Sequence, residues 1–288
     1  MARIFAIVST KGGVGKTTLT ANFGGILADM GQRVLLIDAD HQQSLTNYYK
    51  LDSISSSGLR QLITTANATG CISTTQIAGL DIVLSDDPNK SLNDWLRQSS
   101  SHYQYLLAAL SNLEGYDYVI IDTKGTDGTG ELQEMAIRAS DQLISPITPE
   151  WVSTKEFMRN TVTMLQRLEP PPGIPGGLPI PPMMGLIYGL DRTSDTAQVA
   201  QNLRKAFYDQ SAGKISILNT VVPSVAAYNQ AAGQQVPVHR HETKRYGSSK
   251  TLSAHDTMLS LVHELLPHLS DITPAIKATR SSKEASNG

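Results

Sequence analysis

The chain has very little cysteine and no long apolar run. Its 288 residues include one cysteine, Cys71, which excludes an internal disulfide framework and any metal or iron–sulfur centre that needs two or more cysteines of one chain. No apolar run approaches the roughly 20 residues of a membrane-spanning helix. The N-terminus carries one arginine before a short strand-like segment, Ile4–Val8, so no cleavable signal peptide is predicted. We therefore expect a cytoplasmic protein.

The chain as a whole also lacks a strong excess of either positive or negative charge, because its net charge is −2. Charge is nevertheless unevenly distributed. The stretch from Arg192 to Lys250 holds 8 Lys/Arg and 3 Asp/Glu, whereas the remainder holds 16 and 23. A basic stretch on an acidic body can steer a polyanion to one face of the molecule. Composition alone leaves open the alternative that these charges are simply solvated.

Most of the chain alternates between short apolar runs and helical patterns. The runs are rich in Ile, Val and Leu without clear polar alternation, which is typical of strands buried on both faces. The predicted strands are Ile4–Val8, Val34–Ile37, Leu80–Leu84, Tyr118–Ile121, Gln142–Ile147, Met184–Leu190 and Ile215–Val221. The predicted helices are Lys16–Asp29, Ser91–Leu113, Gly130–Ala139, Val152–Leu168, Ser194–Tyr208 and Leu252–Leu266. This order predicts an α/β fold, a mostly parallel twisted sheet with helices on both faces, in a single domain over residues 1–269.

Two segments interrupt the alternation. Residues 170–182 hold seven prolines and three glycines, so they form neither a helix nor a central strand. We interpret them as an enlarged loop, with a polyproline docking segment for a partner as the alternative. Residues 270–288 are polar and end in Ser, Asn and Gly, which predicts a flexible tail.

A glycine-rich turn joins the first predicted strand to the first predicted helix, with the sequence Ser9-Thr10-Lys11-Gly12-Gly13-Val14-Gly15-Lys16-Thr17-Thr18. Such turns let backbone N–H groups wrap a phosphate chain, and the helix N-terminus adds the positive end of its dipole. Lys16 is expected to reach the β and γ phosphates, and the Thr17 hydroxyl to bind magnesium. The sequence therefore predicts a site for ATP and Mg²⁺.

Two acidic segments follow predicted strands. Asp38-Ala39-Asp40-His41-Gln42 comes after Val34–Ile37, and Asp122-Thr123-Lys124-Gly125 comes after Tyr118–Ile121. A carboxylate at the C-terminal end of a parallel strand points at the crevice in which such sheets bind ligands. Three motifs in order at strand ends are together far more specific than any one of them.

Lys11 stands directly before the first two glycines, giving K-G-G-x-G-K-T-T, and this loop with the two acidic segments resembles the ParA/MinD family of deviant Walker A ATPases, which are P-loop NTPases. The resemblance implies that Lys11 reaches across a homodimer to the partner's nucleotide, and that Asp40 positions or activates the attacking water. It also implies that Asp38 and Asp122 hold magnesium through water. The implied catalytic residues are Lys11, Lys16 and Asp40, and the implied metal residues are Thr17, Asp38 and Asp122. The implied nucleotide-binding residues are Lys11, Gly12, Gly13, Val14, Gly15, Lys16, Thr17, Thr18, Arg192, Val222 and Pro223.

Of these, Arg192, Val222 and Pro223 lie at the ends of two later strands and resemble the family's adenine-lining positions. Two residues depart from the family pattern. His41 stands where the family usually has proline, and Lys124 stands where many relatives have proline or a small residue. These departures leave nucleotide binding intact and bear on the hydrolysis rate and on coupling to partners.

Within the family, the pattern favours a ParA-type partition ATPase that dimerises with ATP and binds duplex DNA non-specifically. The chain begins at the first strand, so we expect no N-terminal helix-turn-helix domain and no operator binding. A ParB-like adaptor protein is the implied partner and stimulator of hydrolysis, and the location is expected to be nucleoid-associated. The candidate phosphate-backbone contacts are Arg204, Lys205, Lys214, Arg240, Lys244, Arg245 and Lys250.

Three other interpretations stay open. A MinD-like membrane-cycling ATPase ends in an amphipathic helix, whereas residues 271–278 contain a proline and little apolar surface, so no membrane partner is expected. The second open interpretation is a relative from cofactor biosynthesis, and the third is a positioning ATPase that moves a protein cargo.

Overall fold

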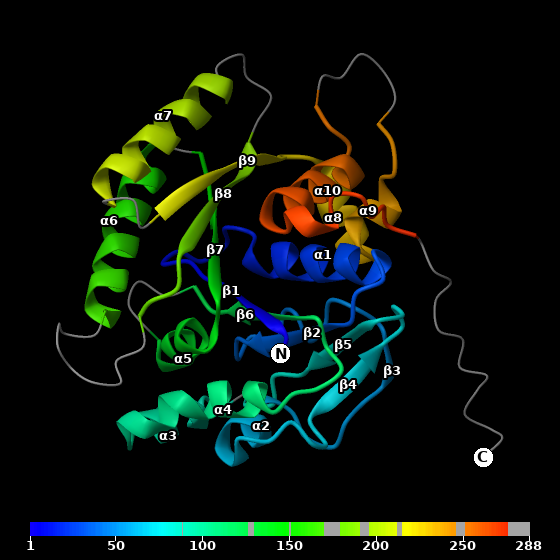
Figure 1. Ribbon diagram of the computed structural model, residues 1–288, viewed down its shortest axis with the longest axis vertical. Coiled ribbons are helices and arrows are strands. Elements are labelled where there is room, and N and C mark those ends of the chain that lie inside the picture. Colours follow the sequence, from blue (N-terminus) through cyan, green and yellow to red (C-terminus); the bar gives the residue numbers. More distant parts are fainter. Residues whose placement is uncertain are drawn as a thin grey trace.

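One twisted sheet runs through the molecule, and in the described residues it has nine strands in the order β3-β4-β5-β2-β6-β1-β7-β8-β9 (Figure 1). The computed structural model describes residues 1–87, 89–125, 130–149, 151–169, 179–190, 196–211, 215–245 and 251–275. The strands are β1 Arg3–Ile7, β2 Val34–Ala39, β3 Leu51–Ser53, β4 Ile72–Thr75, β5 Leu80–Val83, β6 Tyr118–Thr123, β7 Gln142–Ile147, β8 Met183–Leu190 and β9 Ile215–Pro223.

The seven strands from β5 to β9 in this order are parallel, and β3 and β4 extend the sheet as an antiparallel edge. The central strands β1, β2, β6 and β7 are apolar because both of their faces are covered, and nearly every residue in them is buried. The predicted α/β class and its seven parallel strands are confirmed. β3 and β4 escaped prediction because they are short and polar, with sequences LDS and ISTT.

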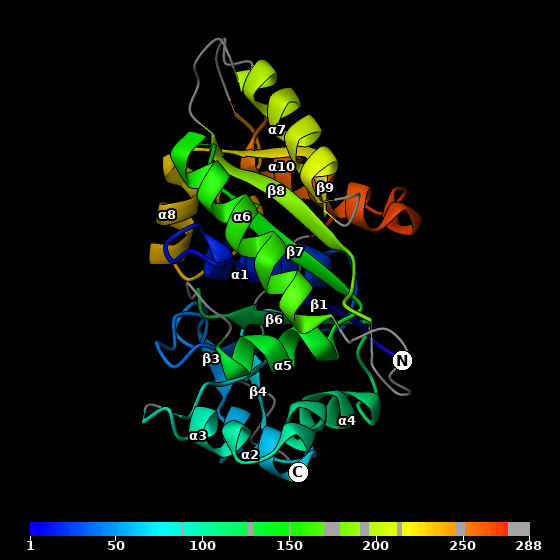
Figure 2. The ribbon, with the colours of Figure 1, turned by 90° about the vertical axis from the view of Figure 1, so that its left-hand side faces the viewer.

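Helices cover both faces of the sheet, and the sheet separates the hydrophobic core into two layers (Figures 1 and 2). One layer contains the apolar sides of α2 Leu59–Thr65, α3 Ser91–Arg97, α4 Tyr105–Ser111, α5 Glu131–Ala139, α6 Trp151–Leu168 and α7 Thr196–Gln210. The other contains α1 Lys16–Asp29, α8 Ala226–Gly233, α9 Val238–His241 and α10 Ala254–Leu265. No helix in the described part of the chain has the length and apolar character needed to cross a membrane.

The predicted helix Ser91–Leu113 is wrong as a continuous element. It consists of α3, a 3-10 turn Ser100–Gln104, and α4. The break falls where Ser99 caps the turn, accepting a hydrogen bond from the Ser101 N–H, because serine side chains compete with helical backbone bonding. The Trp95 ring of α3 stacks on the His102 ring of this turn, with centroids 3.7 Å apart, which fixes the turn against the end of α3.

The proline-rich loop and the tail lie largely outside the described residues, which exclude 170–178 and 276–288. The described beginning of the predicted tail is held against the body. Ile272 packs on the core layer of α1, and the Ala275 N–H donates a 2.8 Å hydrogen bond to the Asp29 carbonyl.

Candidate functional site

The phosphate loop leaves the centre of the sheet at the end of β1 and enters α1 at Lys16. Its first residues are fixed by neighbouring strands. The Val8 N–H donates to the Ile144 carbonyl at 3.0 Å, and the Ser145 hydroxyl donates to the Val8 carbonyl at 2.7 Å. On the other face, the Gln133 amide donates to the Ser9 carbonyl. The loop is therefore anchored on a rigid base before any ligand binds.

Two glycines of the loop have backbone angles that other residues rarely adopt, with φ of +72° at Gly13 and +91° at Gly15. Gly15 is further restricted by its neighbour. A Cβ atom added there would lie 2.5 Å from the Cε1 atom of Tyr188 on β8, well inside van der Waals contact. At Gly12 and Gly13 an added Cβ meets nothing within 4 Å, so open space adjoins this part of the loop.

The end of β6 places Asp122 beneath the start of α1. The Thr17 hydroxyl donates to Asp122 Oδ2 at 2.6 Å, and the Thr20 hydroxyl lies 3.4 Å from Asp122 Oδ1. Asp38 on β2 is the register partner of Asp122 on β6, so the two carboxylates stand side by side at the same edge of the sheet. Asp38 accepts hydrogen bonds from the Asp40 N–H at 3.1 Å and the Thr46 N–H at 2.7 Å.

These buried acids favour a bound cation. Burial, with the nearby charge of Asp38 as a second cause, raises the pKa of Asp122 to about 8. Burial also raises the pKa of Asp38 to about 6, although the N–H groups of Thr46 and Asp40 oppose the shift. Burial lowers the pKa of Lys16, while Asp122 and Asp40 oppose this. A cation at this edge would relieve the cost of keeping both carboxylates ionised without water.

The donors at this edge fit magnesium. Thr17, Asp38 and Asp122 offer oxygen only, which is the ligand chemistry that Mg²⁺ prefers, and two carboxylates leave room for phosphate oxygens and water. In the described residues no group of three or more His, Cys, Asp and Glu side chains is arranged to hold a metal.

Asp40 lies just beyond β2 and is largely buried, at 8% exposure. Its Oδ1 atom accepts a 3.0 Å hydrogen bond from the Gln42 N–H and lies 3.4 Å from His41 Nδ1. Asp40 also contributes to the electrostatic environment of Lys16 and Asp122. The acidic segment after β2 thus acts electrostatically on the buried lysine of the phosphate loop, and the role of Asp40 toward water stays a prediction.

The segment after β6 passes directly over the phosphate loop. A Cβ added at Gly125 would lie 2.4 Å from the Lys11 carbonyl oxygen and 2.7 Å from Lys16 Nζ, so only glycine allows this approach. Lys16 is buried and its ammonium lies 3.4 Å from the Lys11 carbonyl, whereas the side chain of Lys11 is exposed. One lysine thus faces into the loop and the other faces outward.

The predicted adenine contacts are less defined. Arg192 lies outside the described residues. Val222 and Pro223 are buried at the end of β9, where the Ser224 N–H donates to the Leu190 carbonyl and ties β9 to the end of β8. A role for Val222 and Pro223 in lining the base stays a prediction.

The predicted DNA contacts divide into two kinds. Lys205 and Lys244 are exposed, while Lys214 and Lys250 lie outside the described residues. The three arginines are engaged within the chain. Arg240 pairs with buried Asp29, Arg245 pairs with Glu242, and Arg204 donates to the Leu218 and Asn219 carbonyls.

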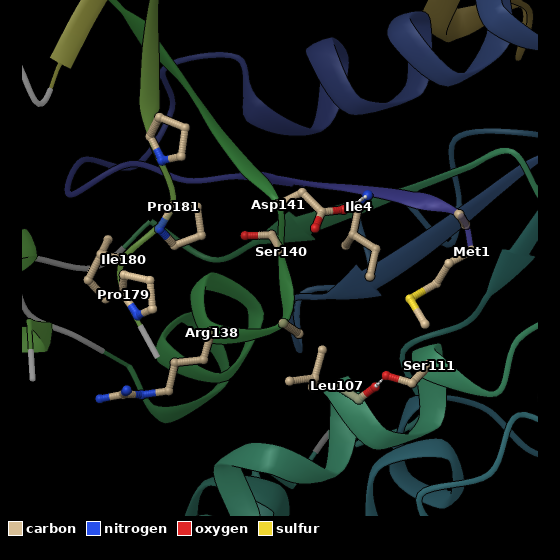
Figure 3. A pocket seen from close by; sticks show the side chains of 13 residues that line it. Met1, Ile4, Leu107, Ser111, Arg138, Ser140, Asp141, Pro179, Ile180 and Pro181 are labelled. Atoms are coloured by element: carbon tan, nitrogen blue, oxygen red, sulfur yellow. Dashed lines mark hydrogen bonds between the residues drawn. The ribbon is translucent and has the colours of Figure 1, made fainter. Parts of the chain in front are cut away.

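A cavity of about 400 Å³ lies away from the phosphate loop, at the N-terminal ends of β1, β7 and β8 (Figure 3). Its charged groups are satisfied internally. Arg138 bonds to Glu134, and the Asp141 carboxylate accepts from the Ile4 N–H at 2.8 Å. The cavity contributes no group to the phosphate loop.

Two site residues were missed from the sequence. Thr20 stands three positions after Thr17 and therefore shares its helix face, a spacing that was available as a signal. Tyr188 carried no local signal, because its contact with Gly15 depends on how β8 lies in the sheet.

Comparison with known proteins agrees with this geometry. Residues 2–169 match the family described as AAA domain. The chain is 29% identical to the sporulation initiation inhibitor protein Soj of Bacillus subtilis over 255 residues, covering 86% of this chain and 94% of Soj. It is 28% identical to the chromosome partitioning protein ParA of Caulobacter vibrioides, covering 87% and 91%.

Solved structures show the same fold. Apo McdA of Cyanothece superposes with a TM-score of 0.66 at 26% identity, over 83% of this chain and 93% of McdA. The septum site-determining protein MinD of Pyrococcus horikoshii, solved with Mg-ADP, gives a TM-score of 0.67 at 21% identity, over 92% and 96%.

Proposed function

The chain belongs to the AAA domain family as a ParA-type P-loop ATPase of the ParA/MinD superfamily, and from this premise we propose that it is an ATP-dependent dimeric switch that binds duplex DNA without sequence preference. In this proposal it segregates or positions a plasmid or chromosomal cargo at the nucleoid, together with a ParB-like adaptor that stimulates hydrolysis.

The observation that carries the proposal is the contact between the phosphate loop and the strand-end acids. Thr17, Asp122 and Asp38 form one oxygen-rich edge beside buried Lys16. In the proposed site, Thr17, Asp38 and Asp122 hold magnesium, which would neutralise phosphate charge. Lys16 and the loop N–H groups bind the phosphate chain, and Asp40 orients the attacking water.

Exposed Lys11 supports the dimeric part of the proposal. A lysine that faces out of its own loop can neutralise charge on a nucleotide held by a second subunit, as an arginine finger does. Hydrolysis then requires two chains, and ATP promotes their association because it supplies the charge that Lys11 meets.

The DNA-binding part of the proposal rests on Lys205 and Lys244, whose exposed side chains can reach phosphate groups. A dimer presents each lysine twice, and affinity for DNA rises steeply with the number of phosphate contacts. Arg240 and Arg245 are better assigned to holding α9 and the segment after it, through Asp29 and Glu242.

The test is an anisotropy titration of random-sequence duplex DNA at two salt concentrations, with ATP and Mg²⁺ or with ADP. We expect binding with ATP, weak binding with ADP, and steep loss on raising salt. Lys205→Gln and Lys244→Gln should each lower the salt slope by about 0.9 for every phosphate that the lysine neutralises in the wild-type complex. Lys50→Gln, which removes an exposed charge elsewhere, is the matched control. Equal affinity with ATP and ADP would contradict the switch, and no binding in either state would favour a membrane-cycling or metabolic relative.

A further inference from the structure

Lys124 follows β6 directly and its side chain is half-buried. The next residue, Gly125, lies so close to the phosphate loop that an added Cβ would lie 2.7 Å from Lys16 Nζ. Lys124 is therefore held beside the loop by a backbone contact that tolerates no side chain at the following position. The backbone position of Lys124 is therefore fixed relative to the phosphate loop.

The charge of Lys124 also acts on the acidic segment after β2. The pKa of His41 is lowered first by burial and then by the positive charge of Lys124, while Asp40 opposes the shift. The His41 Nδ1 atom is 3.4 Å from Asp40 Oδ1. Lys124 therefore acts electrostatically on the His41–Asp40 pair, although the two segments are more than 80 positions apart in the chain.

The other two lysines of the site have different surroundings. Lys16 is buried within the loop and close to Asp122 and Asp40, and Lys11 has an exposed side chain. Lys124, by contrast, acts on His41, which lies 3.4 Å from Asp40, the residue expected to orient the attacking water. The phosphate nearest to that water is the terminal one, which ATP has and ADP lacks.

We propose that Lys124 is a third cation of the ATP site, supplied by the same chain, and that it binds the terminal phosphate and thereby fixes His41 and Asp40 in the arrangement required for hydrolysis. This inference rests on the proposed ATPase function and adds a phosphate-binding residue to it. A cation at this place distinguishes ATP from ADP, because its electrostatic attraction is directed at the group that ADP does not have.

The test compares Lys124→Gln with Lys90→Gln. Lys90 also acts electrostatically on His41, but its side chain is exposed in the turn before α3, so it controls for loss of positive charge near His41. Equilibrium titrations with Mg²⁺ and either a slowly hydrolysed ATP analogue or ADP measure affinity, and single-turnover assays measure hydrolysis.

Lys124→Gln should weaken binding of the analogue at least tenfold and slow hydrolysis, while affinity for ADP stays within twofold of wild type. Lys124→Arg should restore most of the discrimination, and Lys90→Gln should resemble wild type. Equal weakening for both nucleotides would overturn the inference, since Lys124 would then support the loop generally. Unchanged affinity for the analogue would also overturn it. Failure of the wild-type protein to bind either nucleotide would instead reject the proposed function itself.

Discussion

The hydroxyl of Thr17, in the first turn of α1, donates a 2.6 Å hydrogen bond to the carboxylate of Asp122, which lies in β6, 105 positions further along the chain. This bond joins the phosphate loop to the strand-end acid without any ligand between them. Both residues are fixed on regular elements, so the proposed metal-binding edge is preorganised and little rearrangement would be needed on binding.

Lys16→Ala should abolish nucleotide binding. Lys16 is the buried cation of the loop, and its removal leaves phosphate charge opposed only by backbone N–H groups and by the dipole of α1. We expect affinity for ATP and for ADP to fall at least 100-fold in a fluorescence titration. Lys50→Ala should bind both nucleotides normally, and wild-type affinity in Lys16→Ala would contradict the assignment.

Lys11→Ala should separate binding from turnover. Its side chain is exposed, while Lys16 and the loop N–H groups remain, so the monomer should bind ATP within a fewfold of wild type. Dimerisation in the presence of a slowly hydrolysed ATP analogue should be impaired, and ATP hydrolysis should be slow. Size-exclusion chromatography with light scattering measures the dimer. A normal dimer with normal turnover would exclude action across the interface.

Asp40→Ala should keep ATP bound and stop its hydrolysis, which traps the dimer. Asp40 supports neither the loop glycines nor the Thr17–Asp122 contact. A 100-fold lower rate corresponds to a barrier higher by about 2.7 kcal/mol. The measurement is phosphate release under saturating ATP. Hydrolysis at the wild-type rate would show that another group orients the water.

Gly15→Ala should impair the site more than Gly31→Ala does. Both glycines have a positive φ, +91° and +88°, so alanine costs about 1–2 kcal/mol of backbone strain at either position. Only at Gly15 does the new methyl group also meet a neighbour, the ring of Tyr188, whereas at Gly31 nothing lies within 4 Å. We expect similar losses in thermal stability from strain, and a more than tenfold loss of ATP affinity in Gly15→Ala alone. Equal affinities would show that Tyr188 yields without moving the loop.

Stability should fall on mild acidification because of His239. Burial lowers the pKa of this side chain, although Asp29, 2.7 Å away, opposes the shift. The unfolded chain therefore takes up a proton below about pH 6.5 that the folded protein refuses, and the free energy of unfolding falls by up to about 1.4 kcal/mol per pH unit. The pKa of Asp29 is lowered by Arg240 and His239, so its contribution is lost only at more acidic pH.

Denaturant unfolding at pH 7.5 and 5.5 measures this effect. His239→Gln keeps a donor for Asp29 and has no titrating ring, so its stability should fall less between the two pH values than that of wild type. His241→Gln is the control, since the ring of His241 bonds to Gln234 and Gln230. An unchanged pH dependence in His239→Gln would reject the explanation.

The sequence predicted those parts of the fold and site that depend on neighbouring residues. β7 and α1 have the predicted bounds. The start of α1 is marked by the glycine-rich loop that precedes Lys16. The phosphate loop and the acids Asp38 and Asp122 were proposed as site residues because each directly follows a predicted strand, and the structure places both acids in the last two residues of their strands. The antiparallel edge was missed because β3 and β4 are stabilised by pairing along the sheet, which composition does not record.

Pairing of charges was likewise hidden. Arg240 and Arg245 count as basic residues in the sequence, and nothing local reveals that Asp29, 211 positions away from Arg240, is buried against one of them. A count of lysines and arginines therefore overstates the charge that a surface can offer to DNA. The structure leaves Lys205 and Lys244 as the described candidates with exposed side chains.

The place of β1 in the middle of the sheet has a consequence for synthesis of the protein. Of the nine strands described in this sheet, β1 is translated before the others, yet its two neighbours are β6, whose Tyr118 aligns with Arg3, and β7, whose Gln142 aligns with Phe5. A nascent chain that ends before Tyr118 has no partner for this apolar segment. Until then this apolar strand is exposed to aggregation, and the edge formed by Thr17, Asp38 and Asp122 is incomplete because Asp122 has yet to be translated.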